Sequence, residues 1–333
     1  MLRMHLPASL APLLRTCFAL LLTALAIGAN GAASAGTPAM GRFEQLRGQD
    51  LRVARVTYRL AIANQAQCAA VLTPQLGFVL HRLEQYGPAD RQEAAHSFGL
   101  GVHVGVMAVV GDSPADRAGL LPGDQLLSIN GHDLGEPAAN GDQSRRSLDR
   151  AEQILVEHMR RGAVTLRVSS ASGEREIHFV AERGCPSNVE FIPGDEVNAW
   201  ADGKRVMISD GLLGRCATDD DLALVIGHEM AHNLLHHRQR LAAQGASANT
   251  MLPAAAASAE IRAAEEEADR LAVGLATAAA YDLSGAEVFI GRLMGQSNVA
   301  AATHPDLSRR LSLLRAAIAD VRRGGEPGVI PKG

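Results

Sequence analysis

The sequence has few aromatic residues and no excess of positive charge. Among its 333 residues are seven phenylalanines, three tyrosines and one tryptophan, and 36 acidic side chains outnumber 32 basic ones, for a formal net charge of −4. Aromatic side chains supply the surfaces on which bases and sugars stack, and a positive field supplies much of the affinity for nucleic acid. We therefore expect no nucleic-acid partner. The chain does contain 47% hydrophobic residues, enough for buried cores, and twelve histidines.

Long apolar runs are scarce as well. Near the N-terminus, two arginines precede an apolar stretch, Phe18–Ile27, and small residues follow it as far as Ala35. This order is typical of a secretory signal peptide, so we predict that residues 1–35 are removed. An uncleaved anchor helix is the weaker alternative, because the stretch is shorter than the ~20 residues of a membrane span. We expect the remaining chain to be soluble and periplasmic, or otherwise exported.

Cysteine is rare too, and three cysteines remain after the predicted cleavage: Cys68, Cys185 and Cys216. Disulfides persist in exported proteins. A bridge between Cys68 and Cys185 is attractive because these residues bracket the module described next, but sequence alone leaves the connectivity open. In that pairing Cys216 would be a buried thiol.

Residues 97–183 form a module that differs in composition from the rest of the chain, with short β-rich runs separated by glycine, proline and aspartate. The spacing predicts several short strands, a helix over Ser147–Arg160 and a closing hairpin. Residues 43–96 and 185–325 then make one further domain that the module interrupts. The order of elements predicts an insertion and not two domains in series.

One string in this module begins at Ser113 and reads SPADRAGLLPGDQLLSING. It closely resembles bacterial PDZ domains of the type attached to envelope proteases. The resemblance implies that a peptide, often a C-terminus, is added beside the strand that follows a loop of alternating glycine and apolar residues. The residues that match this loop are Gly99, Leu100, Gly101 and Val102. The alternative is a module that only shapes access to a neighbouring site.

The motif His-Glu-Met-Ala-His begins at His228. On a helix, residues i and i+4 project side by side, so His228 and His232 can bind one metal ion while Glu229 points at a neighbouring water. Leucine and valine residues before the motif, with Thr218 or Asp219 as a cap, favour a buried helix.

A catalytic zinc ion needs three protein ligands and an open coordination position. A second helical stretch, Ser258–Ala280, contains Glu265, Glu266, Glu267 and Asp269. Because Glu265 and Asp269 lie four residues apart on one helix face, one can bind metal while the other orients a histidine ligand. Without further context, three consecutive glutamates would indicate a solvated acidic surface.

Further along, His304 precedes a proline and Arg310 follows six residues later. This succession of His-Glu-x-x-His, Glu-x-x-Ala-Asp and His-Pro resembles the M48 family of zinc metallopeptidases, over Asn188–Leu314. The resemblance implies one Zn²⁺ per chain and a structural, non-ligand role for His237. The roles it implies at the site are zinc ligand for His228, His232 and Glu265, general base for Glu229, partner of a ligand histidine for Asp269, contact with zinc or the transition state for His304, and a tie to the His-Pro loop for Arg310. Either His304 or Arg310 is a candidate donor to the oxyanion that develops in the reaction.

We therefore expect an α+β fold: a mainly helical, zincin-type metallopeptidase domain with a small sheet, interrupted by a β-rich PDZ-like domain. The expected function is a zinc-dependent endopeptidase of the cell envelope that cleaves unfolded or misassembled proteins. We expect the strand after Trp200, residues 204–209, to border the cleft and to bind substrate by strand addition. The competing hypothesis is a non-catalytic or latent PDZ adaptor or chaperone, in which His304 closes the zinc site as a fourth ligand.

Overall fold

The computed structural model describes residues 41–134, 145–243, 255–296 and 307–325. The predicted signal peptide, residues 1–35, lies outside this part of the chain. The helices are α1 (Arg42–Ala63), the 3-10 helix η1 (Leu83–Gln85), α2 (Arg91–Phe98), α3 (Pro114–Arg117), α4 (Arg146–Arg160), α5 (Asp210–Leu213), α6 (Asp219–Leu234), α7 (His237–Ala243), α8 (Ala255–Ala278), α9 (Ala286–Gln296) and α10 (Leu307–Arg322). The strands are β1 (Thr73–Pro74), β2 (Phe78–His81), β3 (Val104–Val109), β4 (Gln125–Ile129), β5 (His132–Asp133), β6 (Val164–Ser170), β7 (Gly173–Phe179), β8 (Arg183–Gly184), β9 (Asn188–Ile192), β10 (Ala199–Ala201) and β11 (Arg205–Ser209).

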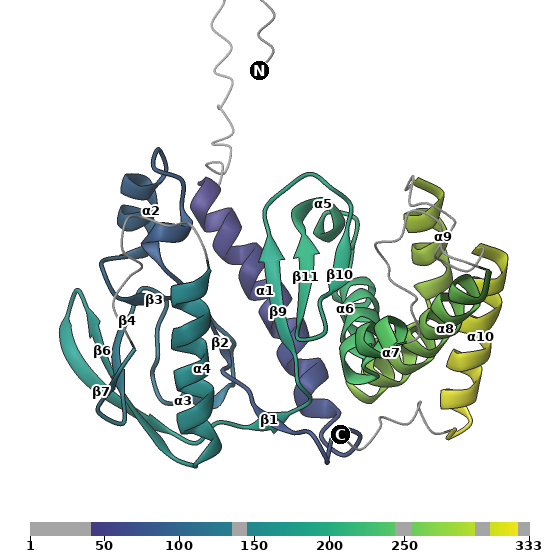
Figure 1. The fold of residues 1–333 in the computed structure, drawn as a ribbon. Coiled ribbons are helices and arrows are strands. Elements are labelled where there is room, and N and C mark those ends of the chain that lie inside the picture. Colours follow the sequence, from purple (N-terminus) through teal and green to yellow (C-terminus); the bar gives the residue numbers. More distant parts are fainter. Residues whose placement is uncertain (1–40, 135–144, 244–254, 297–306, 326–333) are drawn as a thin grey trace, which may run out of the picture. The chain divides into compact units, whose positions relative to one another are not determined.

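The strands form three sheets (Figure 1). An antiparallel sheet has the order β2-β3-β4-β6-β7, with β5 paired to β4. A second sheet has the order β10-β11-β9, in which β11 pairs antiparallel with β10 and parallel with β9. The short strands β1 and β8 pair with each other. Together with the helices, these sheets confirm the expected α+β fold class.

The larger sheet and α4 enclose the core of the PDZ-like unit. Leu148, Ala151, Leu155 and Met159 recur at helical spacing and bury one face of α4 against the sheet. The predicted helix at Ser147–Arg160 and the closing hairpin, β6 and β7, are both present. Local sequence patterning is sufficient here because both elements show a regular period.

The start of this unit differs from the predicted one at residue 97. Strand β2, at Phe78–His81, pairs with β3 and so belongs to the same sheet. The two chain crossings between the units lie instead at the β1–β8 pair, where Thr73 is opposite Gly184. Four residues are too few to show a strand period, so only their pairing assigns β2 to the inserted unit.

A disulfide joins Cys68 to Cys185 beside this β1–β8 pair. The two cysteines are 117 residues apart in the sequence. Their disulfide therefore joins the chain just before the insert to the chain just after it. Cys216 is a free, buried thiol. The structure thus selects the pairing that the sequence left open.

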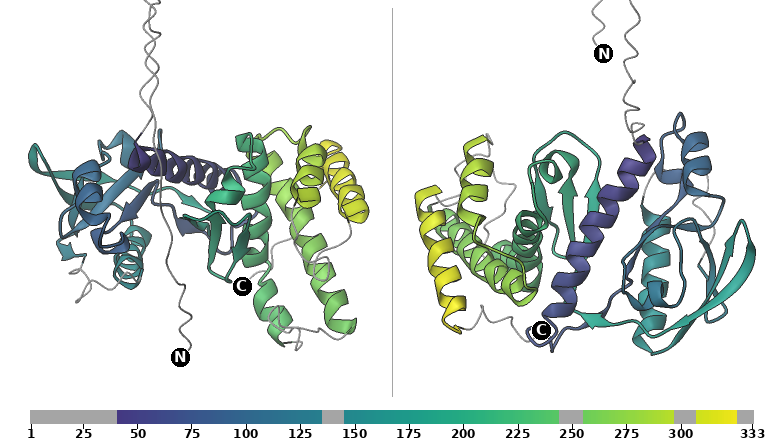
Figure 2. Two further views of the ribbon diagram at one scale, coloured as in Figure 1. Left: turned by 90° about the horizontal axis from the view of Figure 1, so that it is seen from above. Right: turned by 180° about the vertical axis from the view of Figure 1, so that it is seen from behind.

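The second unit is built around α6 and α8, which pack against each other, with α10 against the far side of α8 (Figure 2). Thr218 caps α6: its hydroxyl accepts from the Asp221 backbone N–H, while the Asp221 carboxylate accepts from the Thr218 N–H. Gly227 of α6 faces Ala272 of α8, where even a Cβ would lie at van der Waals distance, 3.4 Å, from the Ala272 backbone. Both features place the following histidine motif against α8.

None of the helices in the described ranges combines the length and the hydropathy that a bilayer span requires.

Candidate metal centre

Three donor atoms meet where α6 and α8 pack. The Nε2 atoms of His228 and His232 lie 3.0 Å apart, and carboxylate oxygens of Glu265 lie 3.4 and 3.5 Å from them. Tetrahedral zinc with bonds of about 2.1 Å places its ligand atoms roughly 3.4 Å apart. The two imidazoles and the carboxylate therefore fit a zinc ion in both donor type and spacing, as the sequence predicted.

A carboxylate and an arginine hold the first histidine. His228 donates from Nδ1 to Asp269 at 2.8 Å, and Arg310 donates two hydrogen bonds to the same carboxylate, each of 2.8 Å. Burial acts to raise the pKa of Asp269, yet its bonds to His228 and Arg310 keep that pKa below its ordinary value. An ionised Asp269 accepts the Nδ1 proton, which leaves the Nε2 lone pair for the metal.

A second relay fixes the tautomer of His232. Glu267 accepts from the Nε2 of His237 at 3.1 Å and from Arg240, whose hydrogen bond is the main reason that the pKa of Glu267 is lowered. Burial lowers the pKa of His237, so its ring is neutral and its Nδ1 is an acceptor. His232 must then donate from its own Nδ1 across the 2.9 Å between the two atoms, which presents its Nε2 to the metal.

Sequence reasoning placed His237 outside the ligand set, as found here, but missed Glu267 and Arg240. A signal was available: Glu267 follows the proposed ligand by two residues, and Arg240 follows His237 by three. Neither spacing shows that α7 packs against α8, and that contact brings the three side chains together.

Glu229 lies on α6 directly after His228 and is half-buried. Burial alone would lower the pKa of Arg310, but the carboxylates of Asp269, Glu265 and Glu229 raise it. The side chain of Glu229 therefore lies within electrostatic reach of the group that orients His228. A negative charge at this position can accept a proton beside the metal site.

The two remaining predicted catalytic residues differ in outcome. His304 lies outside the described residues. Arg310 is mostly buried and forms two hydrogen bonds to Asp269, so its guanidinium is committed to orienting His228. A role of Arg310 as donor to a developing oxyanion stays a prediction.

The strand expected to accept substrate also differs. Residues 205–209 form β11, which has β10 on one side and β9 on the other, so its edges are already paired. The edge strand that packs against α6 is β10, whose Trp200 keeps 38% of its surface exposed. The side chain of Asn233, next to His232, ties α6 to this sheet by donating to the Arg205 carbonyl and accepting from the Gly203 N–H.

The predicted PDZ peptide loop needs the same kind of correction. Residues 99–102 precede β3, but β3 lies between β2 and β4 and has no free edge for an added strand. The edge strand is β2, preceded by a loop at Gln75–Gly77. Gly77 has φ +70°, and a Cβ there would lie 2.6 Å from Ser113, so this tight approach requires glycine.

The free edge of β2 opens into a cavity of about 1240 Å³ that is also lined by α4. Val79 and Leu80 of β2 and Val156 of α4 are among its walls. A strand edge beside a helix is the arrangement by which PDZ domains bind an extended peptide. In this unit that arrangement occurs at β2 and α4, one strand earlier in the chain than the predicted loop.

Replacing Asp269 with asparagine should weaken zinc binding about 10–100-fold. The amide removes the charge that accepts the His228 Nδ1 proton, so the ring is no longer held in the tautomer that presents Nε2. Competition with a chelating dye measures the dissociation constant. Asp320→Asn is the control, because Asp320 is exposed on α10 and pairs only with Arg323 among its described ionic contacts. Equal affinities in the two variants would contradict the role of Asp269.

Two domain families match this sequence. Peptidase family M48 matches residues 171–260 and 254–318, and a PDZ domain matches residues 105–155. Mitochondrial metalloendopeptidase OMA1 from Schizosaccharomyces pombe (strain 972) is 27% identical over 133 residues, which cover 33% of this chain and 40% of that protein. The solved structure of HtrA-type protease AlgW with decapeptide is 28% identical, covers 34% of this chain and 30% of that chain, and has a TM-score of 0.24.

The chain thus spans less than half the length of the curated relative it matches. The matched M48 region contains the His-Glu-x-x-His motif, Glu265 and Asp269, whose side chains converge at the α6–α8 contact. The matched PDZ region lies in the inserted unit. Residues 171–318 of this chain are thus similar to peptidase family M48, and residues 105–155 to a PDZ domain.

Proposed function

We propose that this protein is a zinc-dependent endopeptidase in which Glu229 assists the attack of water on a peptide bond. The observation that carries the proposal is the geometry of the three donors. Both histidines are held through Nδ1, so that both Nε2 atoms face the Glu265 carboxylate at 3.4–3.5 Å. Three protein ligands of this kind leave a coordination position for water, as catalytic zinc sites do.

A zinc ion at this site supplies Lewis acidity, which polarises a peptide carbonyl and lowers the pKa of water to about 7. The chain's own residues supply proton transfer and orientation. Glu229 accepts the proton that water loses and returns it to the leaving amine. The lowered pKa values of Asp269 and Glu267 keep both carboxylates ionised. Asp269 holds His228 directly, and Glu267 holds His232 through His237.

We infer that the substrate is an extended polypeptide. Strand β10 lies at an edge of its sheet and packs against α6, so backbone groups of a substrate strand can pair with it beside the metal donors. Recognition through backbone favours unfolded or misassembled proteins over any one side-chain sequence. The exposed ring of Trp200 on β10 offers an apolar contact for a substrate side chain.

Two features support the proposal of an exported, periplasmic location. The N-terminal segment has the order of a signal peptide, and Cys68 and Cys185 form a disulfide. Structural disulfides persist in oxidising compartments. We therefore propose that the substrates are proteins of the cell envelope.

Removing zinc tests the proposed function. The purified protein should degrade β-casein, lose that activity when a chelator strips the metal, and recover it when a stoichiometric amount of Zn²⁺ is added. Peptide release by mass spectrometry measures the rate, and metal content is measured on the same samples. If the protein binds zinc tightly but cleaves no polypeptide, the peptidase assignment is wrong and the PDZ adaptor hypothesis is favoured.

A further inference from the structure

The cavity at the PDZ groove is shared with the peptidase unit. Its walls include β2 and α4 of the PDZ domain and also β9, from Asn188 to Ile192. In the described part of the chain β9 stands at the end of the β10-β11-β9 sheet, just as β2 stands at the end of its own. Two strand edges from different units therefore face one cavity.

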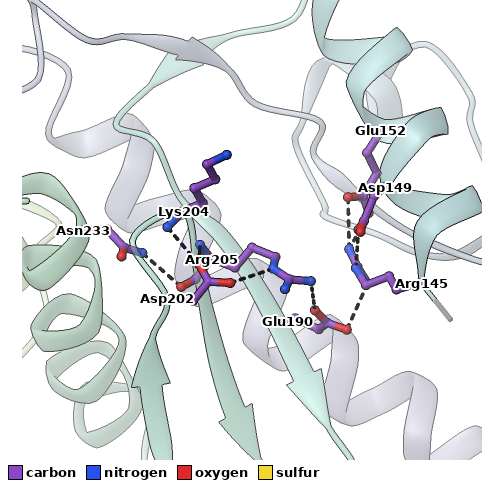
Figure 3. Close-up of polar contacts among 8 residues, drawn as sticks. All are labelled: Arg145, Asp149, Glu152, Glu190, Asp202, Lys204, Arg205 and Asn233. Carbon is purple, nitrogen blue, oxygen red and sulfur yellow. Dashed lines mark hydrogen bonds and ion pairs between the residues drawn. The ribbon is translucent and has the colours of Figure 1, made fainter. Parts of the chain in front are cut away.

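An ion pair between Arg145 and Glu190 joins α4 of the insert to β9 of the other unit at this cavity (Figure 3), and Arg42 of α1 pairs with Asp90 of the insert elsewhere on its wall. Arg145, at the N-terminus of α4, lies 3.2 Å from Glu190 in the middle of β9. The same guanidinium pairs with Asp149 and Glu152 of its own helix at 2.9 and 2.8 Å. Because these partners fix the arginine on α4, its contact with Glu190 sets where the start of α4 lies against β9.

Glu190 also contacts β11, in the sheet that packs against the metal-ligand helix α6. Its second carboxylate oxygen lies 3.5 Å from Arg205 of β11, and Asp202 pairs with the same guanidinium at 3.1 Å (Figure 3). The backbone carbonyl of Arg205 accepts from Asn233, the residue after His232. The polar chain therefore runs from the PDZ helix to the helix of the metal ligands.

The Arg145–Glu190 pair is well suited to hold α4 in one position relative to β9. Both side chains are less than a fifth exposed, so solvent screens the pair less than a surface salt bridge. The disulfide and the β1–β8 pair restrain the insert at the chain crossings, and α1 packs against its strands β2 and β3. The Arg145–Glu190 pair adds a restraint at α4, the side of the groove opposite β2.

We propose that the Arg145–Glu190 pair aligns the PDZ groove with β9, so that one extended polypeptide binds the edges of β2 and β9 together. This inference rests on the proposed function, since it describes how a polypeptide substrate is held before cleavage. Arg145 and Glu190 act as positioning residues. They do not touch the reacting atoms.

The features of the cavity favour a polypeptide of basic character as the occupant. Each edge strand offers backbone N–H and C=O groups, which an extended chain satisfies by strand addition. Acidic side chains outnumber basic ones along the walls. A segment rich in lysine or arginine therefore complements the cavity in both hydrogen bonding and charge.

Peptide length provides the test. The probes are two fluorescent peptides of repeating Lys-Val-Ser-Thr, of about six and about sixteen residues, which extend roughly 20 and 53 Å at ~3.3 Å per residue. The first can cover one strand edge and the second can cover both. Anisotropy titration uses the full chain with Glu229→Gln, so that binding is measured whether or not the protein cleaves peptides.

The long peptide should bind about tenfold or more tightly than the short one, because attachment at the first edge makes attachment at the second intramolecular. Arg145→Gln should remove most of this preference, and Glu190→Gln should do the same from the other side of the pair. Arg167→Gln is the matched control: it removes a charge from β6 that pairs with Glu174 inside the PDZ domain, and it should keep the preference.

Spin labels then measure the distance between the two units directly. They are attached to cysteines introduced at two exposed residues, Ser172 in the PDZ domain and Thr277 on α8. The distance distribution should be narrow in the parent and in the Arg167→Gln control, and broad in both pair variants. The proposal is overturned if the parent shows no preference for the long peptide, or if both pair variants keep that preference. It is equally overturned if their distance distributions stay as narrow as the parent's. Each of these outcomes leaves the zinc-dependent cleavage of casein untouched, so the two proposals fail separately.

Discussion

Replacing Glu229 with glutamine should abolish proteolysis while the zinc site stays loaded. Glutamine has nearly the same size and shape as glutamate but cannot accept a proton from water. Loss of a positioned general base typically costs 10²–10⁴-fold in rate, so kcat on β-casein should fall by about that factor. The ligand set His228, His232 and Glu265 is unchanged, and the bound zinc measured by mass spectrometry should equal that of the parent.

Glu266→Gln provides the matched control for this experiment. Glu266 carries the same charge, is next to the ligand Glu265 on α8, and pairs with Arg309 instead of a metal donor. Its kcat should remain within about twofold of the parent, as expected for an isosteric change at a partly buried residue that contacts no metal donor. Full activity of Glu229→Gln, with zinc bound, would show that water is activated by another group and that the assignment is wrong.

Removing the disulfide should cost the largest amount of stability. The bond between Cys68 and Cys185 closes a loop with a sequence separation of 117 residues, and the chain-entropy estimate for a loop of this size is about 5 kcal/mol. Replacing both cysteines with alanine should lower the free energy of unfolding by that order, as measured by urea denaturation. Hydrogen exchange should accelerate at β1 and β8, which pair beside the bond.

Cys216→Ala separates the bond from the loss of a buried sulfur. Cys216 is buried and unbonded, so its replacement removes one sulfur from the core and should cost only about 1 kcal/mol. If the double variant is no less stable than Cys216→Ala, the loop closure contributes nothing measurable to the stability of the protein.

Local sequence signals predicted several elements well. The cap at Thr218, the apolar positions of α6 and the spacing of the histidines lie within one helix, and they predicted the helix and its metal-facing side together. Likewise, α4 showed its buried face through residues three and four apart. In both cases the information is local, because helix geometry depends on neighbours within one or two turns.

Strand edges were the main failure. The peptide groove was predicted at Gly99–Val102 and the substrate strand at residues 204–209, yet both β3 and β11 lie inside their sheets. Sequence shows that a segment is extended but not which strands flank it. A free edge depends on pairing between distant segments, here β2 with β3 and β11 with β9.

Sequence by itself predicted the donor residues of this protein: the two histidines and the glutamate of one helix, Glu265 as third donor through the family resemblance, and a PDZ-like insert within the domain that carries them. The tertiary structure decided how that chemistry is oriented. Asp269 with Arg310, and His237 with Glu267, act on the ligand histidines only because α8 packs against α6, with α7 and α10 packed against α8. The Arg145–Glu190 pair exists only because the insert packs against β9. Ligand type follows from residue identity, whereas tautomer, alignment and free edges follow from contacts between residues far apart in the chain.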